Sequence, residues 1–294
     1  MFVSTETING APIENNRPPF VRLGAFILKQ VPTWSHRGRS LVVKNILDGY
    51  NKIMDLLFLP IAFVSEIIGT IAGFGSSTIA LPLSLFIFDF HTALALVAFL
   101  HIFGNISRIS FFKHGLNGRM LLMFGVPSII FTLIGAFLVE SISQNLLKMI
   151  LGLFLVIYTF WSWSGKLQIK QSFTTSTIGG SLSGFFAGLI GTGGALRGAF
   201  LTAFGLPKEK YIATAAAIAL AVDITRLPVY LKGGFLESRL YWTLPVILII
   251  ALCGSFAGKQ ITDRISQSVF RRIVLVTIFI VALKFIIDWL INIL

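Results

Sequence analysis

Long apolar stretches separated by short polar segments dominate this chain. Two of them, residues 120–139 and 240–258, run for about 20 positions without a charge, the length at which a helix crosses a hydrocarbon core about 30 Å thick. Because a bilayer offers no water to the backbone, each stretch must satisfy its own peptide groups and is expected to be helical. The predicted helices are 53–73, 76–88, 91–112, 120–139, 146–164, 178–191, 195–204, 211–231, 240–258 and 270–293.

Two of these helices, 76–88 and 195–204, are too short to span a bilayer unaided. The pattern therefore predicts an all-α polytopic membrane protein with eight full transmembrane helices and two short or broken ones, or 8–10 spans. If the short helices do not cross, each half of the chain holds four spans and the halves run parallel; if they cross, the halves are inverted. The Lys and Arg residues of the loops favour the first arrangement when the N-terminus is cytoplasmic, and both stay open.

The five helices before a polar linker and the five after it follow the same order of lengths, which indicates an internal duplication. A shift of 118 positions aligns 65–131 with 183–249 without a gap. Chance matching of apolar sequences would pair Leu, Ile and Ala more readily than Gly, Arg and Pro. The shift matches Gly73 with Gly191, Gly75 with Gly193, Arg108 with Arg226 and Pro127 with Pro245. The predicted domains are a cationic cytoplasmic segment at 1–52, a first repeat at 53–165, a linker at 166–175 and a second repeat at 176–294.

Composition and charge narrow the class of protein. Hydrophobic residues make up 55% of the chain and charged residues 12%, about half the charged share of a soluble domain. The net charge of +12 lies in loops and in the N-terminal segment, where it suits anionic lipid better than nucleic acid. Residues 1–45 are polar and cationic, without a secretory leader; residues 20–31 are expected either as an amphipathic surface helix or as part of a disordered tail.

A Gly-rich break precedes each short helix. Glycine permits a left-handed backbone, and the unpaired peptide groups of a break are tolerated in a membrane only inside protein or beside water. The N-terminus of the helix after each break attracts anions, and paired broken helices are the best sequence indicator of a transporter site. Tight helix packing by small residues is the alternative. The candidate residues are Gly73, Gly75, Ser76 and Ser77 in the first break and Gly191, Thr192, Gly193 and Gly194 in the second.

A second pair of candidates places a polar residue three positions before an arginine, hence on the same helix face. These are Asn105 with Arg108 and, at the matching positions, Asp223 with Arg226. A guanidinium fork suits sulfonate, carboxylate or phosphate oxygens. The alternatives are arginines that snorkel to the interface, and an Asp223 that merely neutralises Arg226.

Two further charged residues lie in apolar surroundings. Glu66 lies midway along 53–73, where a carboxylate is costly unless paired or protonated, so it is a candidate for proton coupling or for a structural hydrogen bond. Arg197 follows the second break and is a further candidate for contacting an anion. His101 shares a face with Asn105 and is expected to pack rather than to bind metal. With one cysteine and no nucleotide or nucleophile motif, neither cofactor, metal site nor enzymatic activity is expected.

The Gly-rich stretches with the runs that follow them, GFGSSTIALP at 73–82 and GTGGALRGAF at 191–200, resemble the sulfite exporter TauE/SafE family of membrane permeases. In that family each half also carries a long helix and then a Gly-containing loop, which match Gly115 and Gly233 here, and the resemblance extends over about 53–294. Ser76 and Ser77 stand where glycines are usual, and Phe200 stands where proline is expected.

The resemblance implies a multi-pass transporter of a bacterial-type cytoplasmic membrane, with sulfite or an organosulfonate such as sulfoacetate or a taurine-like compound as substrate. A secondary carrier that exports the anion by alternating access between the repeats is expected. The alternatives are an uptake permease or a channel for another small organic or inorganic anion and, less favoured, a membrane-embedded enzyme. The expected partners are the small anion and the lipid bilayer, without nucleic acid, and a homodimer is a further arrangement left open.

Overall fold

The computed structural model describes residues 7–8, 11–12, 36–73, 75–112, 115–164 and 170–262, together with positions 279, 282–283, 286–287 and 289–291. The predicted surface helix at 20–31 and most of the predicted helix at 270–293 lie outside the described residues. The chain forms two compact units, residues 1–56 and 57–294. In the first unit, strands β1 (Thr7–Ile8) and β2 (Ala11–Pro12) pair antiparallel, with Thr7 opposite Pro12.

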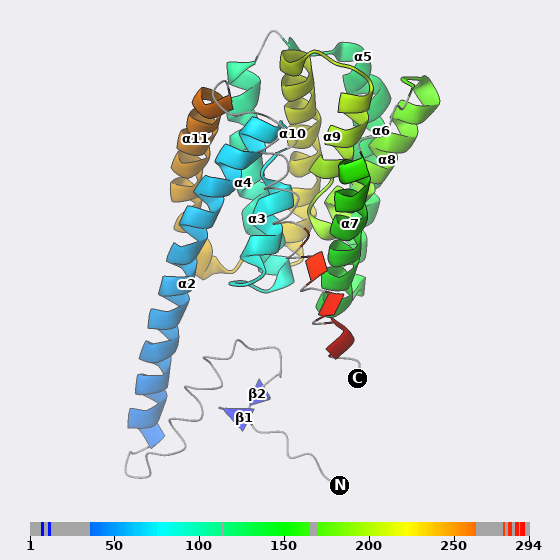
Figure 1. The fold of residues 1–294 in the computed structure, drawn as a ribbon. Coiled ribbons are helices and arrows are strands. Elements are labelled where there is room, and N and C mark those ends of the chain that lie inside the picture. The colour runs from blue at the N-terminus through cyan, green and yellow to red at the C-terminus, as the bar shows by residue number, and fades with distance from the viewer. Residues whose placement is uncertain are drawn as a thin grey trace. The chain divides into compact units, whose positions relative to one another are not determined.

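Helix α2 (His36–Ala72) begins in the first unit and ends in the second, and the remaining described elements belong to the second unit (Figure 1). The first of these, in chain order, are α3 (Ser77–Ser84), α4 (Phe90–Phe111), α5 (Gly118–Met120), a π-helical turn η2 (Leu121–Gly125), α6 (Val126–Leu138), a 3-10 turn η3 (Val139–Ser141) and α7 (Gln144–Ser164). They are followed by α8 (Phe173–Ile190), α9 (Gly194–Ala203), α10 (Lys208–Lys232), a 3-10 turn η4 (Ser238–Leu240) and α11 (Thr243–Thr262).

Six helices of the described part are long and apolar enough to cross a membrane. They are Lys52–Ala72, Phe90–Phe111, Gly118–Ser141, Gln144–Trp161, Glu209–Lys232 and Thr243–Ile261. The all-α polytopic prediction is confirmed at this level, whereas eight full spans are not. Helix α8 is not among the six, because Gly, Ser and Thr occupy much of its 18 residues.

Several helix ends follow directly from local sequence. Asp89 precedes α4 and its carboxylate accepts hydrogen bonds from the backbone N–H groups of His91 and Thr92, which is a standard N-cap. Ser172 and Thr175 form a reciprocal capping box at the start of α8.

Helices α4 and α10 pack against each other in opposite directions. Beyond the end of α4, Gly115 lies against the backbone of Glu209 at the start of α10, and Asn117 N donates to Thr214 Oγ1 at 3.0 Å. At the other end, His91 near the start of α4 stacks on Phe235, just after α10, with ring centroids 4.2 Å apart. The two helices are therefore antiparallel, as Figure 1 also shows.

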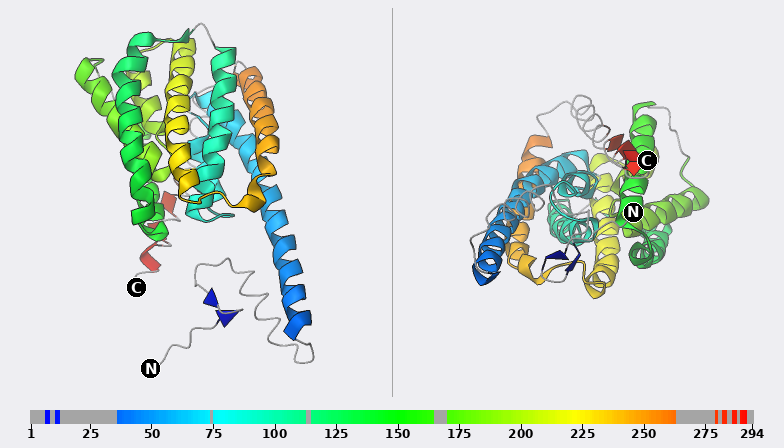
Figure 2. Two further views of the ribbon diagram at one scale, coloured as in Figure 1. Left: turned by 180° about the vertical axis from the view of Figure 1, so that it is seen from behind. Right: turned by 90° about the horizontal axis from the view of Figure 1, so that it is seen from below.

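Small residues bring two further helix pairs into close contact. Along α8, a Cβ added at Gly184 or Gly188 would overlap the backbone of α6. Hydroxyls reinforce this contact, since Thr132 Oγ1 of α6 donates to the Gly184 carbonyl at 3.0 Å. In the same way, Gly254 of α11 lies against Phe63 of α2, and Figure 2 shows α11 beside this part of α2.

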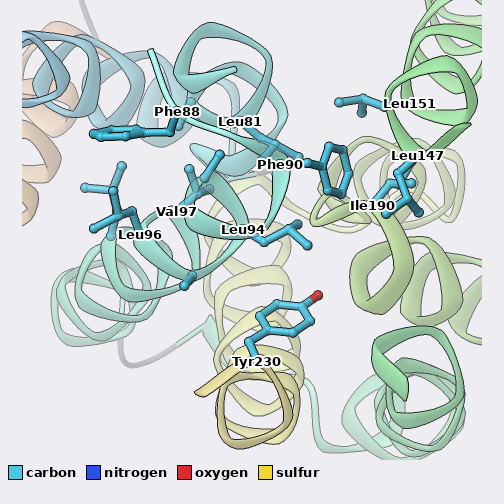
Figure 3. Close-up of a cluster of buried hydrophobic side chains, with 14 of the residues drawn as sticks. Leu81, Phe88, Phe90, Leu94, Leu96, Val97, Leu147, Leu151, Ile190 and Tyr230 are labelled. Atoms are coloured by element: carbon cyan, nitrogen blue, oxygen red, sulfur yellow. The ribbon is translucent and has the colours of Figure 1, made fainter. Parts of the chain in front are cut away.

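The core of the second unit is apolar, and so is much of its outer surface. Figure 3 shows Phe90 and Leu94 of α4 between Leu147 of α7 and Tyr230 of α10, all of them buried. Large apolar side chains nevertheless face outward on most helices; Leu122, for example, is 69% exposed. An apolar exterior of this extent is unusual in a soluble protein and suits contact with lipid.

Candidate functional site

The first glycine break joins α2 to α3. Gly73 (φ 75°) and Gly75 (φ 95°) both adopt left-handed backbone, which side chains with a Cβ rarely tolerate. Both fold back onto α2, because their N–H groups donate to the Gly69 carbonyl at 3.0 and 3.4 Å. The turn is crowded as well, since a Cβ at Gly73 would overlap the Tyr211 ring of α10. Ser76 and Ser77 follow and are buried.

The second break joins α8 to α9. Gly191 ends α8 in left-handed backbone (φ 72°) and Gly194 begins α9. The carbonyl of Gly193 accepts a hydrogen bond of 2.9 Å from the Ser183 hydroxyl of α8. The two breaks meet, because Thr192 Oγ1 lies 2.9 Å from Thr78 Oγ1 in the first turn of α3.

Arg108 of α4 is buried beside the first break, and each nitrogen of its guanidinium has a partner. Nε donates to Thr70 Oγ1 at 3.1 Å, Nη1 donates to Asn105 Oδ1 at 2.5 Å, and Nη2 pairs with Glu66 Oε2. Among the described residues, Glu66 has further partners in the hydroxyls of Ser76 and of Ser255, the latter at 3.1 Å. The carboxylate thus ties together α2, the first break, α4 and α11.

Arg226 of α10 has a comparable place beside the second break. Its Nε and Nη2 contact Asp223 Oδ1 at 2.9 and 2.7 Å, and Nη1 donates to the Ala187 carbonyl at 2.5 Å. The guanidinium lies 5.7 Å from the ring centroid of Tyr230, whose hydroxyl donates to the Gly188 carbonyl. Arg226 therefore fastens α10 to the last turn of α8.

Asp223 joins the two clusters into one buried network. Asn105 Nδ2 donates to Asp223 Oδ2 at 3.4 Å, across 118 positions of sequence. His101 Nδ1 lies 2.8 Å from the same oxygen, a buried polar contact whose partner the sequence did not identify. The i, i+4 spacing of His101 and Asn105 was the one signal in the sequence that could have revealed this role.

Arg197 of α9 differs from the other two arginines. It is only 2% exposed, and its Nε has no hydrogen-bond partner within the part of the chain that the structure describes. It lies close enough to Asp223, Arg226 and Arg108 to interact with them electrostatically. Within the described residues of the second unit, the buried formal charges are three arginines against two carboxylates, so the network carries an excess positive charge when His101 is neutral.

The structure thus brings most of the sequence candidates into one region. Neither Thr70 nor Ser255 was anticipated, because a lone Thr or Ser in an apolar helix gives no signal of the arginine or carboxylate that it meets. Among the described residues, no group of three or more His, Cys, Asp or Glu is placed so that it could hold a metal ion.

Two broken helices that meet beside a buried charged network, within a bundle of apolar helices, define a polytopic membrane transporter. The sequence comparisons bear this out. The profile of the family described as sulfite exporter TauE/SafE matches residues 58–285, and the chain belongs to this family. A curated relative, the "Probable membrane transporter protein" of Methanocaldococcus jannaschii, is 26% identical over 242 residues, covering 74% of this chain and 91% of the relative. No solved structure matches the chain.

Proposed function

We propose that this protein is a secondary carrier that exports a small sulfur-containing oxyanion, such as sulfite or an organosulfonate, across the cytoplasmic membrane. The anion binds where the two glycine breaks meet, with Arg197 as its principal contact. Gly75, Ser76, Ser77, Thr192, Gly193 and Gly194 line this position, and Arg108 and Arg226 flank it. The family of the chain supports the class of substrate.

The observation that carries the proposal is that Arg197 is buried, with no ion pair and no hydrogen bond at Nε among the described residues. A buried charge costs several kcal/mol unless it is paired, and an anion that binds beside it supplies the counter-charge. The N-terminus of α9, which begins at Gly194, adds partial positive charge near the same break. A small anion satisfies both, whereas a neutral or cationic substrate satisfies neither.

Alternating access requires two elements that exchange positions around the site, and we propose that an inverted duplication supplies them. Matching helices α4 and α10 run antiparallel, and their matching residues Asn105 and Asp223 contact each other. The helix packing is repeated as well. In the alignment of the halves, α2 corresponds to α8 and α6 corresponds to α11; α6 of the first half packs on α8 of the second, and α11 of the second half packs on α2 of the first. This favours inverted over parallel halves, against the indication from loop charges.

Export is the direction that the membrane potential favours for an anion in a cell whose interior is negative. Each charge that leaves gains about 2.3 kcal/mol at 100 mV, so export needs no coupled ion. The surroundings of Glu66 support this, because a carboxylate that pairs with Arg108 and accepts from two hydroxyls is suited to a structural role. Uptake would have to overcome the same electrical term and would require a coupled proton.

Purified protein in liposomes tests the proposal. We expect saturable flux of sulfite, sulfoacetate or thiosulfate, driven by an imposed voltage and abolished in Arg197→Gln. Unitary currents would instead identify a channel, and accumulation that requires a pH gradient would identify an uptake permease. Failure of all these anions to bind or move, in protein that is folded and correctly inserted, would reject the proposal.

A further inference from the structure

The two ring nitrogens of His101, in the middle of α4, face different surroundings. The side chain is 3% exposed, and Nδ1 lies 2.8 Å from Asp223 Oδ2. Because Asp223 is itself held by Arg226 and Asn105, this contact fixes the orientation of the ring. Nε2 points to the first break, since a Cβ at Gly75 would overlap it. Neither ring nitrogen forms a well-aligned hydrogen bond among the described residues, but only Nδ1 has a carboxylate oxygen beside it.

A second buried nitrogen in this region also lacks a hydrogen-bond partner. The Nε of Arg197 is also buried without a partner in the described part of the chain, and the two side chains are close enough to interact electrostatically. Buried polar groups are nearly always hydrogen-bonded, so each exception needs an explanation. An oxyanion has several acceptor oxygens and can take one hydrogen bond from each side chain, the histidine of α4 and the arginine of α9.

We infer that His101 is a ligand of the transported anion and that it binds the anion only as an imidazolium. This inference rests on the proposed function. In the neutral ring, with the Nδ1 hydrogen directed to Asp223, Nε2 bears a lone pair that repels the oxygens of an anion. Protonation turns Nε2 into a donor. The protein therefore takes up a proton, at His101 Nε2, when the anion binds, and by reciprocity protonation of His101 raises the affinity for the anion.

An anion that binds beside the ring adds negative charge there and so stabilises the imidazolium relative to the neutral ring. The charged groups that face this region are Glu66 from α2, which is engaged by Arg108, Arg108 from α4 itself, Arg197 from α9, and Asp223 and Arg226 from α10.

Calorimetric titration of the purified full-length chain with thiosulfate tests this, since thiosulfate stays fully ionised while histidine titrates. Between about pH 6 and pH 8 we expect the affinity of the wild type to fall by about tenfold per pH unit, with about one proton taken up per anion in buffers of different ionisation enthalpy. His101→Gln should bind more weakly and with no dependence on pH. His91→Gln, on the same helix but outside the network, is the matched control and should keep the dependence.

Three results would overturn the inference: binding by the wild type without proton uptake, a pH dependence that survives in His101→Gln, or one that disappears in His91→Gln. If His101→Gln does not fold, histidine-selective NMR of the wild type decides, because thiosulfate must then convert an imidazole to an imidazolium. Absence of thiosulfate binding by the wild type at every pH rejects the inference together with the proposed site. Binding that depends on Arg197 but not on pH rejects the inference alone.

Discussion

Replacement of Arg197 by glutamine separates an anion-binding arginine from a structural one. The guanidinium is buried, and its Nε is not hydrogen-bonded within the described residues, so the substitution leaves no carboxylate without its partner. A hydrogen bond from a charged donor to an anion contributes about 1.5–3 kcal/mol, so we expect affinity for thiosulfate or sulfite to fall by about 10- to 100-fold. Stability without ligand should stay the same or rise, because an unfavourable buried charge is removed.

Arg108→Gln is the matched comparison, since it removes the same charge from a site that is equally buried. There the guanidinium pairs with Glu66, which would be left as an isolated carboxylate in the protein interior. Removal of one partner of a buried ion pair costs about 3–5 kcal/mol, so this variant should lose stability as well as affinity. The two variants therefore differ in stability, although they change the net charge equally.

Thermal unfolding in detergent, with and without thiosulfate, measures both effects in one assay. The wild type should be stabilised by the anion, Arg197→Gln should keep its melting temperature but lose the anion-dependent increase, and Arg108→Gln should melt at a lower temperature. If Arg197→Gln retains the affinity of the wild type, the uncompensated charge is not a binding site. If it melts as low as Arg108→Gln, the arginine is a structural residue.

Two further substitutions test the role of the carboxylate and the helix packing. Glu66→Gln should lower stability, because Arg108 loses its counter-charge, while flux in proteoliposomes stays driven by voltage; proton-driven accumulation abolished by this change would instead make Glu66 the coupling group. Gly184→Ala should destabilise by about 1–3 kcal/mol in denaturant titrations, because its Cβ would overlap the Ser128 carbonyl of α6, whereas Gly118→Ala, with no heavy atom of the described residues within 4 Å, should have a much smaller effect.

Much of the fold was predictable because membrane helices can be recognised in a sequence by their length and hydropathy. The breaks at Gly73 and Gly191 were located correctly, since a left-handed turn inside an apolar run requires glycine. Helix α8 was expected to span the membrane fully. Its Gly, Ser and Thr residues allow close contact with α6, but they make the helix less apolar than a membrane span of this length usually is. The direction of α4 relative to α10 was left open, because hydropathy cannot tell a helix that crosses from one that turns back.

The site was predictable only in part, because the sequence identifies polar residues but not their partners. The i, i+3 spacing placed Asp223 beside Arg226 correctly. It gave no sign that Glu66 would pair with Arg108, 42 positions away, because that contact depends on how α2 and α4 pack. Nor did it show that Arg197 would form no ion pair with a carboxylate of the described residues, because that depends on how all the helices assemble.

The two breaks differ in charge because different residues occupy positions that correspond to each other in the proposed duplication. At a shift of 118, Glu66 corresponds to Gly184, and Ile79 corresponds to Arg197. The first break thus acquires a carboxylate that neutralises Arg108, while the second lacks this carboxylate and gains an extra cation.

This asymmetry leads to a last prediction, on stoichiometry. Two symmetric cationic breaks would hold two anions, whereas a single arginine without an ion pair among the described residues offers one binding site. We therefore expect about one thiosulfate per chain in calorimetric titration, with about 10- to 100-fold weaker binding in Arg197→Gln. Restoring symmetry should change this number: Glu66→Gln frees Arg108, so a second, weaker anion should bind wherever that variant remains folded. If the wild type binds two anions with equal affinity, the reasoning is refuted. Arg108 would then bind an anion despite its ion pair with Glu66, and Arg197 would not be what makes the second break different from the first.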